Sequence, residues 1–336
     1  MKRTTITDVA GWAGVSIATV SHYLNGTKRV SSEIAERIDA AIKELNYIPN
    51  ANARSLKSKQ TYTIGLVIPD IVMYSSICYY IESQLYENGY NVIICNTNFD
   101  HIRENKYLNS LLERRVDGLI LATSGQNEQL IKRFEKSGIP VVLFDRMQPT
   151  LKGNYILEKH EQCIITMTEY LIENNHKNIA YIKGPRSSYV SEFRFGKFKE
   201  ILKKNSIDLL SDFYFDNCYS EEVCDQAFDK ICSNLNKITA VMLTNANQIK
   251  YLIKYGNKNG IKLPQELSFL GFGLEEYKTL FAYPITCIVQ NHYDIARNVA
   301  DKILELIDCE KNKQIKEYET ILVESEFFKG KSVIKL

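Results

Sequence analysis

The chain opens with apolar positions spaced as on the buried stripe of a short helix. Val9, Ala10 and Ala13 share one helical face, and Thr5 stands three residues before Asp8, as an N-terminal cap requires. Gly14 follows at a position where a residue with positive φ can end the helix. This spacing predicts a first helix over residues 6–13.

A second helix is predicted over residues 17–25, with Ser16 as its N-cap. Its buried side would carry Val20, Tyr23 and Leu24. Four side chains are then left on the outer face at its N-terminal end: Ile17, Ala18, Ser21 and His22. In a helix–turn–helix, this is the end of the second helix that enters the major groove of DNA.

A third helix follows a loop that carries Lys28 and Arg29. Either Ser31 or Ser32 can cap it, and apolar residues recur at helical spacing up to Leu45. The pattern predicts a three-helix head over residues 1–48. Residues 49–61 come next as a hinge, whose short helix is below the length that holds in water, so we expect it to be helical only on DNA.

From residue 62 onward the pattern changes to short apolar runs that alternate with amphipathic stretches. The runs that predict strands are 64–69, 91–95, 119–122, 141–144, 179–182, 240–243 and 268–272. Strands that alternate with helices predict parallel sheets covered by helices on both faces, with ligands bound at the carboxyl ends of the strands. The predicted fold class is therefore α + α/β.

Composition and charge narrow the function. The sequence is 45% hydrophobic and 24% charged, and no apolar run approaches the roughly 18–20 residues that span a bilayer, so we expect a cytoplasmic protein without a membrane partner. Residues 1–59 carry nine Lys/Arg against five Asp/Glu, whereas the whole chain has a net charge of only +2. A basic head fits a polyanionic partner, although a solvated basic surface would give the same count.

Motifs of enzymes and metal proteins are missing from the sequence. The eight cysteines are scattered singly without a C-x-x-C pair, which predicts buried thiols, no metal and no cofactor. Neither G-x-G-x-x-G nor G-x-x-x-x-G-K-[ST] occurs, and no catalytic constellation is visible. The loop 184–188 could cradle an anion, but an ordinary strand-to-helix loop explains it better. We therefore expect no catalytic residues.

The N-terminal string TTITDVAGWAGVSIATVSHYLN resembles the opening of the LacI/GalR family of transcriptional regulators, T-I-x-D-V-A-x-x-A-G-V-S-x-x-T-V-S-x-x-L-N. The resemblance continues through P-N-A-x-A-R-S-L at 49–56 and into the body. Its further landmarks are T-I-G-L-V-I-P-D at 63–70, R-R-V-D-G-L-I at 114–120, P-V-V-L-F-D-R at 140–146 and L-P-Q-E-L-S-F-L-G-F at 263–272. It therefore runs nearly end to end.

The resemblance implies a DNA-binding surface on the head and hinge. We expect Ile17, Ala18 and His22 to contact base edges, with Thr19 beside them on the same helix. Phosphate contacts are expected from Thr5, Ser16, Ser21, Asn25, Lys28 and Arg29. In the family, the hinge helix enters the minor groove and a leucine there wedges between base pairs. The matching hinge residues are Asn50, Ala53, Leu56 and Lys57, with Leu56 as the wedge.

The resemblance also implies that residues 62–336 form a two-subdomain body like a periplasmic sugar-binding protein, with an effector held between the subdomains. The expected boundaries are 62–160 plus 292–320 for the N-subdomain and 161–290 plus 322–336 for the C-subdomain. Residues expected to hold the effector are Asp70, Tyr74, Asp145, Arg194, Asn245 and Gln290.

Several positions depart from the family's sugar-binding pattern. The usual D-N after the subdomain crossover is replaced near 157–159, and N-D and G-F-D become Asn245-Ala246 and Gly271-Phe272-Gly273. Two acids that would accept hydrogen bonds from sugar hydroxyls are therefore absent, and each unpaired ligand group would cost about 1–3 kcal/mol. Two alternatives follow: a different effector, more apolar or anionic, or a body that no longer senses small molecules.

Taken together, these patterns predict a repressor of carbohydrate-related genes that binds a near-palindromic operator in double-stranded DNA as a homodimer. Dimerisation would begin with the helix over residues 77–88. A sugar or sugar-derived effector in the cleft would change operator affinity by altering the angle between the subdomains. The alternative is a DNA-binding regulator that is constitutive or controlled by a protein coregulator.

Overall fold

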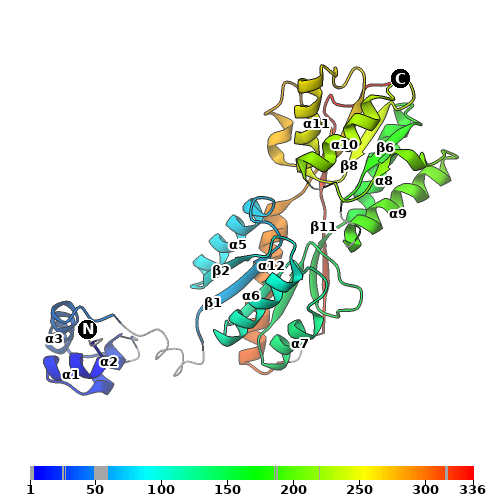
Figure 1. The fold of residues 1–336 in the computed structure, drawn as a ribbon. Helices are drawn as coiled ribbons and strands as arrows, with labels where there is room; N and C mark the ends of the chain where they lie inside the picture. Colours follow the sequence, from blue (N-terminus) through cyan, green and yellow to red (C-terminus); the bar gives the residue numbers. More distant parts are fainter. Residues whose placement is uncertain are drawn as a thin grey trace. The chain divides into compact units, whose positions relative to one another are not determined.

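The computed structural model describes residues 4–24, 26, 28–48, 60–184, 186, 188–218, 220–314 and 317–336. The chain forms two compact units, residues 1–61 and 62–336 (Figure 1). Among the described residues, no helix is long and apolar enough to cross a membrane.

The first unit is the predicted three-helix head, with α1 (Ile6–Ala13), α2 (Ile17–Leu24) and α3 (Ser32–Glu44). Thr5 and Asp8 form a capping box at the start of α1, and Gly14 ends that helix with φ of 64°. Ser31, rather than Ser32, caps α3. The small core contains Val9, Ala10, Ala13, Val20, Ile38, Ala41 and Tyr47.

The second unit begins with a parallel six-stranded sheet in the order β11-β5-β4-β3-β1-β2. Its strands are β1 (Thr63–Ile68), β2 (Asn91–Asn96), β3 (Gly118–Leu121), β4 (Val141–Phe144), β5 (Asn154–Glu158) and β11 (Thr320–Val323). Helices α5 (Ser75–Glu87) and α12 (His292–Lys311) pack on one face, while α6 (His101–Glu113) and α7 (Glu128–Lys136) pack on the other. Each face thus has its own apolar core.

A second six-stranded sheet has the order β12-β10-β9-β8-β6-β7. Its strands are β6 (Ile179–Ile182), β7 (Tyr214–Phe215), β8 (Ala240–Leu243), β9 (Ser268–Gly273), β10 (Cys287–Val289) and β12 (Glu326–Phe328). Helices α8 (His160–Glu173) and α9 (Tyr189–Lys204) cover one face, and α10 (Glu221–Cys232) and α11 (Ala246–Asn259) cover the other. Two 3-10 turns, η1 (Ser211–Phe213) and η2 (Glu275–Lys278), lie in loops of this half.

Three connections join the two halves of the body: β5 to α8, β10 to α12, and β11 to β12. The structure refines two expectations here. The first sheet continues through Val323, three residues past the expected boundary at 320, because β11 pairs with β5. The second sheet is not purely parallel, because β12 runs antiparallel to β10. β11 and β12 follow one another along the chain but belong to different sheets, so the chain enters this edge from the first sheet and not through a crossover helix of the second.

Candidate functional site

The head exposes the N-terminal end of α2. Ser16 caps this helix, since its Oγ accepts a hydrogen bond from the backbone N–H of Thr19 at 3.1 Å, and its hydroxyl pairs with that of Thr19 at 2.8 Å. Val20 is buried, whereas Ala18 is exposed and Ile17 keeps 47% of its surface exposed. Ser21 and His22 are half-buried. The outer face predicted for this end of α2 is therefore exposed at Ile17 and Ala18 and partly covered at Ser21 and His22.

The residues expected to contact phosphate differ in exposure and in the hydrogen bonds that they already make. Lys28 and Arg29 are exposed in the loop after α2. The hydroxyls of Thr5 and Ser16 are already used in caps, the former with Asp8 Oδ2 at 2.7 Å. Caps of this kind leave backbone N–H groups and a positive dipole at the start of each helix, which also suits a phosphate. The remaining DNA-binding predictions, Asn25, Asn50, Ala53, Leu56 and Lys57, lie outside the described residues.

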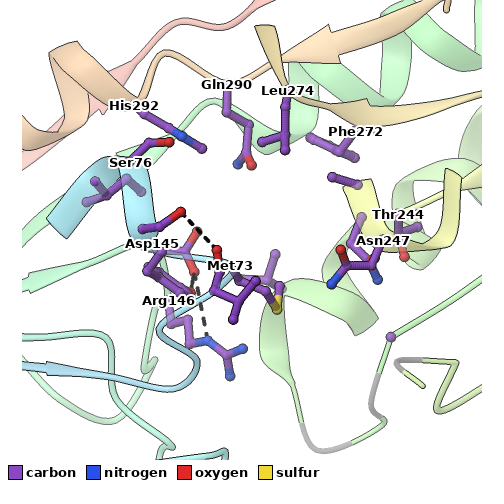
Figure 2. A pocket seen from close by; sticks show the side chains of 18 of the residues that line it. Met73, Ser76, Asp145, Arg146, Thr244, Asn247, Phe272, Leu274, Gln290 and His292 are labelled. Atoms are coloured by element: carbon purple, nitrogen blue, oxygen red, sulfur yellow. Dashed lines mark hydrogen bonds and ion pairs between the residues drawn. The ribbon is translucent and has the colours of Figure 1, made fainter. Parts of the chain in front are cut away.

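A cavity of about 330 Å³ lies between the two halves of the body, at the carboxyl ends of their strands. Figure 2 shows side chains that converge on this space from both halves, with Met73, Asp145 and His292 facing Asn247, Phe272 and Leu274. We call this cavity the cleft. Five of the six residues predicted to hold an effector line it: Tyr74, Asp145, Arg194, Asn245 and Gln290.

Asp70, the sixth, is not among the residues that line the cleft. Its Oδ1 instead accepts hydrogen bonds from the backbone N–H groups of Val72 and Met73, at 2.8 and 2.9 Å. An aspartate that bonds to the backbone two and three residues ahead stabilises a turn. Asp70 therefore shapes the loop that carries Met73 and Tyr74 to the cleft.

One wall of the cleft is a partly buried network around Asp145. Asp145 adopts φ of 61° at the end of β4, a left-handed conformation that turns its carboxylate toward the hydroxyl of Tyr74, which donates a hydrogen bond to it. Burial, together with the nearby carboxylate, raises the pKa of Tyr74, so the phenol stays neutral. The Arg146 guanidinium lies over the ring of Phe99 at 5.1 Å, and its Nε is 3.8 Å from Asp145.

Beside the cleft lies Glu158, a buried carboxylate at the end of β5, the strand next to β4 in the first sheet. Its Oε2 accepts hydrogen bonds from Gln290 Nε2 at 3.1 Å and from Arg194 Nη2 at 3.3 Å, and lies 2.9 Å from His160 Nδ1. Its Oε1 accepts a hydrogen bond from the Ser325 hydroxyl. These partners come from all three connections between the halves and from α9. We call Glu158, His160, Arg194, Gln290 and Ser325 the joint cluster.

The charges of the joint cluster fix the state of Glu158. Burial alone would raise the pKa of this carboxyl, but the hydrogen bond and charge of His160, with the Arg194 guanidinium and the Ser325 hydroxyl, hold it down to about 2. Glu158 is therefore ionised at neutral pH. A carboxylate with so many donors is strongly tied to its surroundings.

Arg194 is held rigidly by its neighbours. Besides Glu158, its Nη1 donates to the backbone carbonyl of Thr244 at 2.9 Å, and its guanidinium stacks on the ring of Phe272 at 3.6 Å. Its Nε and the hydroxyl of Ser191, both on α9, are buried without a hydrogen-bond partner in the described part of the chain. Both residues line the cleft, so α9 brings unsatisfied donor groups to this site.

Asn245 has a structural role at the mouth of the cleft. Its side chain and that of Gln248 form a capping box at the start of α11, with Asn245 Oδ1 accepting from the Gln248 N–H at 3.0 Å. Gln248 is fully buried and bonds back to the Thr244 N–H at 2.7 Å. Asn245 therefore shapes the loop as well as lining the cavity.

The absence of an acid at Gly273 has a steric counterpart. A Cβ placed on Gly273 would lie 2.7 Å from Cys287 Sγ and 3.0 Å from the ring of Tyr277. An aspartate at this position would therefore require its neighbours to move. The packing around Gly273 thus disfavours the acid that the family carries there. His292 lines the same cleft, and burial lowers its pKa, which favours the neutral imidazole.

Sequence reasoning missed Glu158, His160, Arg146, Phe99 and Ser325 as parts of the site. In the sequence, Glu158 stands out only as part of the segment that replaces the usual D-N, whereas in the structure it supplies a buried carboxylate. The signal that could have found it is a charged residue at the end of an apolar strand, next to His160. Across the described ranges, no cluster of His, Cys, Asp and Glu could hold a metal ion.

Comparison with known proteins places both units. Residues 5–50 match the family described as "Bacterial regulatory proteins, lacI family", and residues 61–331 match "Periplasmic binding proteins and sugar binding domain of LacI family". The HTH-type transcriptional repressor PurR of Vibrio vulnificus (strain CMCP6) is 32% identical over 323 residues, which cover 95% of this chain and 97% of that protein. PurR of Vibrio parahaemolyticus serotype O3:K6 is likewise 32% identical over 323 residues, with the same coverage.

A solved structure of similar architecture is the lac repressor dimer bound to operator and the anti-inducer ONPF. It has a TM-score of 0.83 and 25% sequence identity, and the match covers 99% of this chain and all of that one. A transcriptional regulator from Silicibacter pomeroyi has a TM-score of 0.81 at 22% identity over 98% of this chain and 99% of that one, a likeness of fold.

Proposed function

We propose that this chain, which belongs to the LacI family of bacterial regulatory proteins, represses its target genes as an effector-controlled homodimer. Its relatives in this family are DNA-binding transcriptional repressors and not enzymes. Each head would read one half of a near-palindromic operator. The proposal goes beyond the family assignment in three respects: the residues that read DNA, the dimer face, and the ligand that controls binding.

For DNA reading, the supporting observation is the exposed N-terminal end of α2. Ile17 and Ala18 would meet thymine methyl groups, and His22 would hydrogen-bond a purine, while Lys28 and Arg29 hold phosphates. The test compares His22→Ala with Lys28→Ala on an operator selected from a random DNA pool and on its single-base variants. His22→Ala should relax discrimination at one base position, whereas Lys28→Ala should weaken binding to every sequence. Equal weakening by both would remove the base-reading role of His22.

For dimerisation, the supporting observation is an aromatic surface on the first half of the body. Tyr79 and Tyr86 on α5 are 66% and 71% exposed, and Tyr293 on the adjacent α12 is 50% exposed. The three rings of Tyr79, Tyr80 and Tyr293 meet edge to face. Apolar surface of this kind is favoured in protein interfaces. Tyr86→Glu should shift the protein toward monomer in sedimentation, whereas Ile102→Glu on α6 should not.

For control, the supporting observation is the cleft itself, which draws Asp145 and His292 from one half and Arg194 and Asn247 from the other. A ligand that touches both halves can bias their relative arrangement, provided that it binds one arrangement more tightly. With the two family acids missing and donor atoms unsatisfied on α9, we propose an effector richer in acceptors than an unmodified sugar, such as a sugar acid or another small carboxylate.

The effector proposal is tested by thermal shift of the full chain against sugars, sugar phosphates and organic acids, followed by operator binding with each hit. A compound that raises Tm and changes operator affinity, with both effects lost in Asn247→Trp, supports control through the cleft. Silence across the whole panel would favour the alternative, a regulator that is constitutive or controlled by a protein coregulator.

A further inference from the structure

A second cavity, of about 420 Å³, lies beside the joint cluster. It shares Asp145 and Val190 with the cleft but is otherwise lined by different residues. Both halves of the body contribute to it, with Met147 and Leu322 from the side of the first sheet and Ile165, Tyr189 and Phe193 from α8 and α9. We call it the joint cavity. Apart from Asp145, none of its lining residues enters the function proposed above.

The wall of the joint cavity is mainly apolar and partly open to water. Met147, Tyr189 and Leu322 keep 40%, 43% and 53% of their surface exposed. The rings of Tyr189 and Phe193 lie 6.1 Å apart and nearly parallel, at 27°. Covering such side chains with an apolar group is favourable, and cavities of roughly 300–1,000 Å³ are the size that small molecules occupy. An aromatic ring fits both the size and the flat walls.

Asp145, Glu158, Lys159, Glu161 and Gln162 also line this cavity, but His160 is the lining residue whose ring nitrogen lacks a partner in the described part of the chain. That nitrogen is Nε2, and it is buried. The Nδ1 of His160 lies 2.9 Å from both Glu158 Oε2 and Arg194 Nη2, one an acceptor and the other a donor. Nδ1 can therefore satisfy only one of them. Nε2 is left as an acceptor when the neutral ring carries its proton on Nδ1, and as a donor in the other tautomer and in the imidazolium. A hydroxyl group can pair with Nε2 in either case.

We propose that the joint cavity is a second small-molecule site, separate from the cleft, that takes a phenol-type ligand: an aromatic ring against Tyr189 and Phe193, with a hydroxyl that pairs with His160 Nε2. The observations that carry this proposal are the apolar walls drawn from both halves and the unpartnered nitrogen among them. A protein segment or a second copy of the chain would cover the same apolar side chains, so the experiment must separate these occupants.

The test uses two matched probes, 4-fluorophenol and fluorobenzene, titrated with the full chain and followed by ¹⁹F NMR line broadening. Both rings should bind, and the phenol should bind about fivefold tighter, because a net hydrogen bond is worth about 1 kcal/mol. His160→Phe should bring the phenol to the affinity of fluorobenzene and leave fluorobenzene itself unchanged.

Two variants that fill the cavity test the site without altering any residue of the joint cluster. Met147→Trp and Leu322→Trp alter exposed side chains and should each abolish binding of both probes. Ile102→Trp, at an exposed position on α6 outside the lining, is the matched control and should bind normally. Met73→Trp, which narrows the cleft, should also leave binding intact.

Several results would overturn the proposal. If neither probe binds, or if Met73→Trp removes binding while Met147→Trp and Leu322→Trp retain it, the joint cavity is not the site. Equal affinity for the two probes would refute the role of His160. A change in sedimentation of Met147→Trp at equal concentration would identify the face as a contact between copies. None of these outcomes depends on operator binding, so a failure here is distinct from a failure of the effector proposal.

Discussion

Replacing Glu158 by glutamine tests the joint cluster directly. The substitution keeps the shape of the side chain but removes the negative charge that accepts hydrogen bonds from Gln290, Arg194 and Ser325. One oxygen becomes an NH₂ group, which meets other donors. The Arg194 guanidinium is then left buried without its carboxylate.

The magnitude follows from the pKa of this group. Folding holds the pKa of Glu158 at about 2, against an ordinary value of 4.5. Since one pKa unit corresponds to about 1.4 kcal/mol, the folded site prefers the carboxylate over a neutral carboxyl by about 3 kcal/mol. A neutral amide should cost a similar amount, which agrees with the roughly 3–5 kcal/mol lost when one partner of a buried ion pair is removed.

The assay is urea unfolding of the full chain at pH 7, followed by far-UV circular dichroism. Trp12, the single tryptophan, lies in the head and would not report on the body. Glu161→Gln is the matched control, because Glu161 is exposed and pairs only across the surface with Lys197 at 2.8 Å. Glu158→Gln should lower the free energy of unfolding by about 3 kcal/mol and the control by less than about 1 kcal/mol. Equal losses in the two variants would refute the reasoning.

The same argument fixes a pH dependence. Because the pKa of Glu158 is lower in the folded protein than in the unfolded chain, its contribution is fully present above about pH 4.5 and disappears as the pH falls toward 2. The stability difference between wild type and Glu158→Gln should therefore be constant at neutral pH and shrink steadily below pH 4.5. A difference that stays constant down to pH 2.5 would contradict the assigned charge.

Three further predictions concern packing, capping and thiol chemistry. Gly271→Ala should lower the free energy of unfolding by about 1–3 kcal/mol, because a Cβ there would collide with the Leu243 carbonyl oxygen. In the same unfolding assay, Gly196→Ala on α9 should be neutral or stabilising by up to about 1 kcal/mol, because open space surrounds that position. Thr5→Ala should lower the free energy of unfolding by about 1 kcal/mol in thermal melts monitored by circular dichroism, because the capping box on α1 is lost. Thr7→Ala, exposed on the same helix, should lower it by less, and equal effects would argue against the cap. Thiol labelling with a disulfide reagent at pH 8, read by mass spectrometry, should reach Cys232 first, because the other cysteines are buried. Labelling of Cys232 should itself be slow, because burial raises the pKa of this thiol to about 11; fast labelling of Cys163 would contradict the packing.

The local signals in the sequence predicted the head closely. Thr5 with Asp8, Gly14 and Ser16 act within a few residues of one another, so the chain needs no distant partner to place α1 and α2. The longer apolar runs of the body were likewise sufficient to predict β1, β4, β6 and β8. Strands of two or three residues, such as β7 and β10, were missed, because so short a run carries no period and exists only through its neighbours.

The cleft could be predicted only in part. Tyr74, Asp145, Arg194, Asn245 and Gln290 were expected there from resemblance and do line it. Asp70 was expected beside them, but its carboxylate bonds to its own turn, a local competition that the motif could not reveal.

The amino-acid order was enough to predict the three-helix head, the alternating α/β body and the kinship to a family of DNA-binding repressors, because helical spacing, caps and long apolar runs act over short stretches of chain. It did not reveal that Glu158, Arg194, Gln290 and Ser325 share one buried cluster, which became visible only in the folded chain. These residues lie far apart in the sequence, and each alone reads as an ordinary polar side chain. They meet because three separate connections cross between the sheets at one place, where a carboxylate removed from water must be satisfied by every donor within reach.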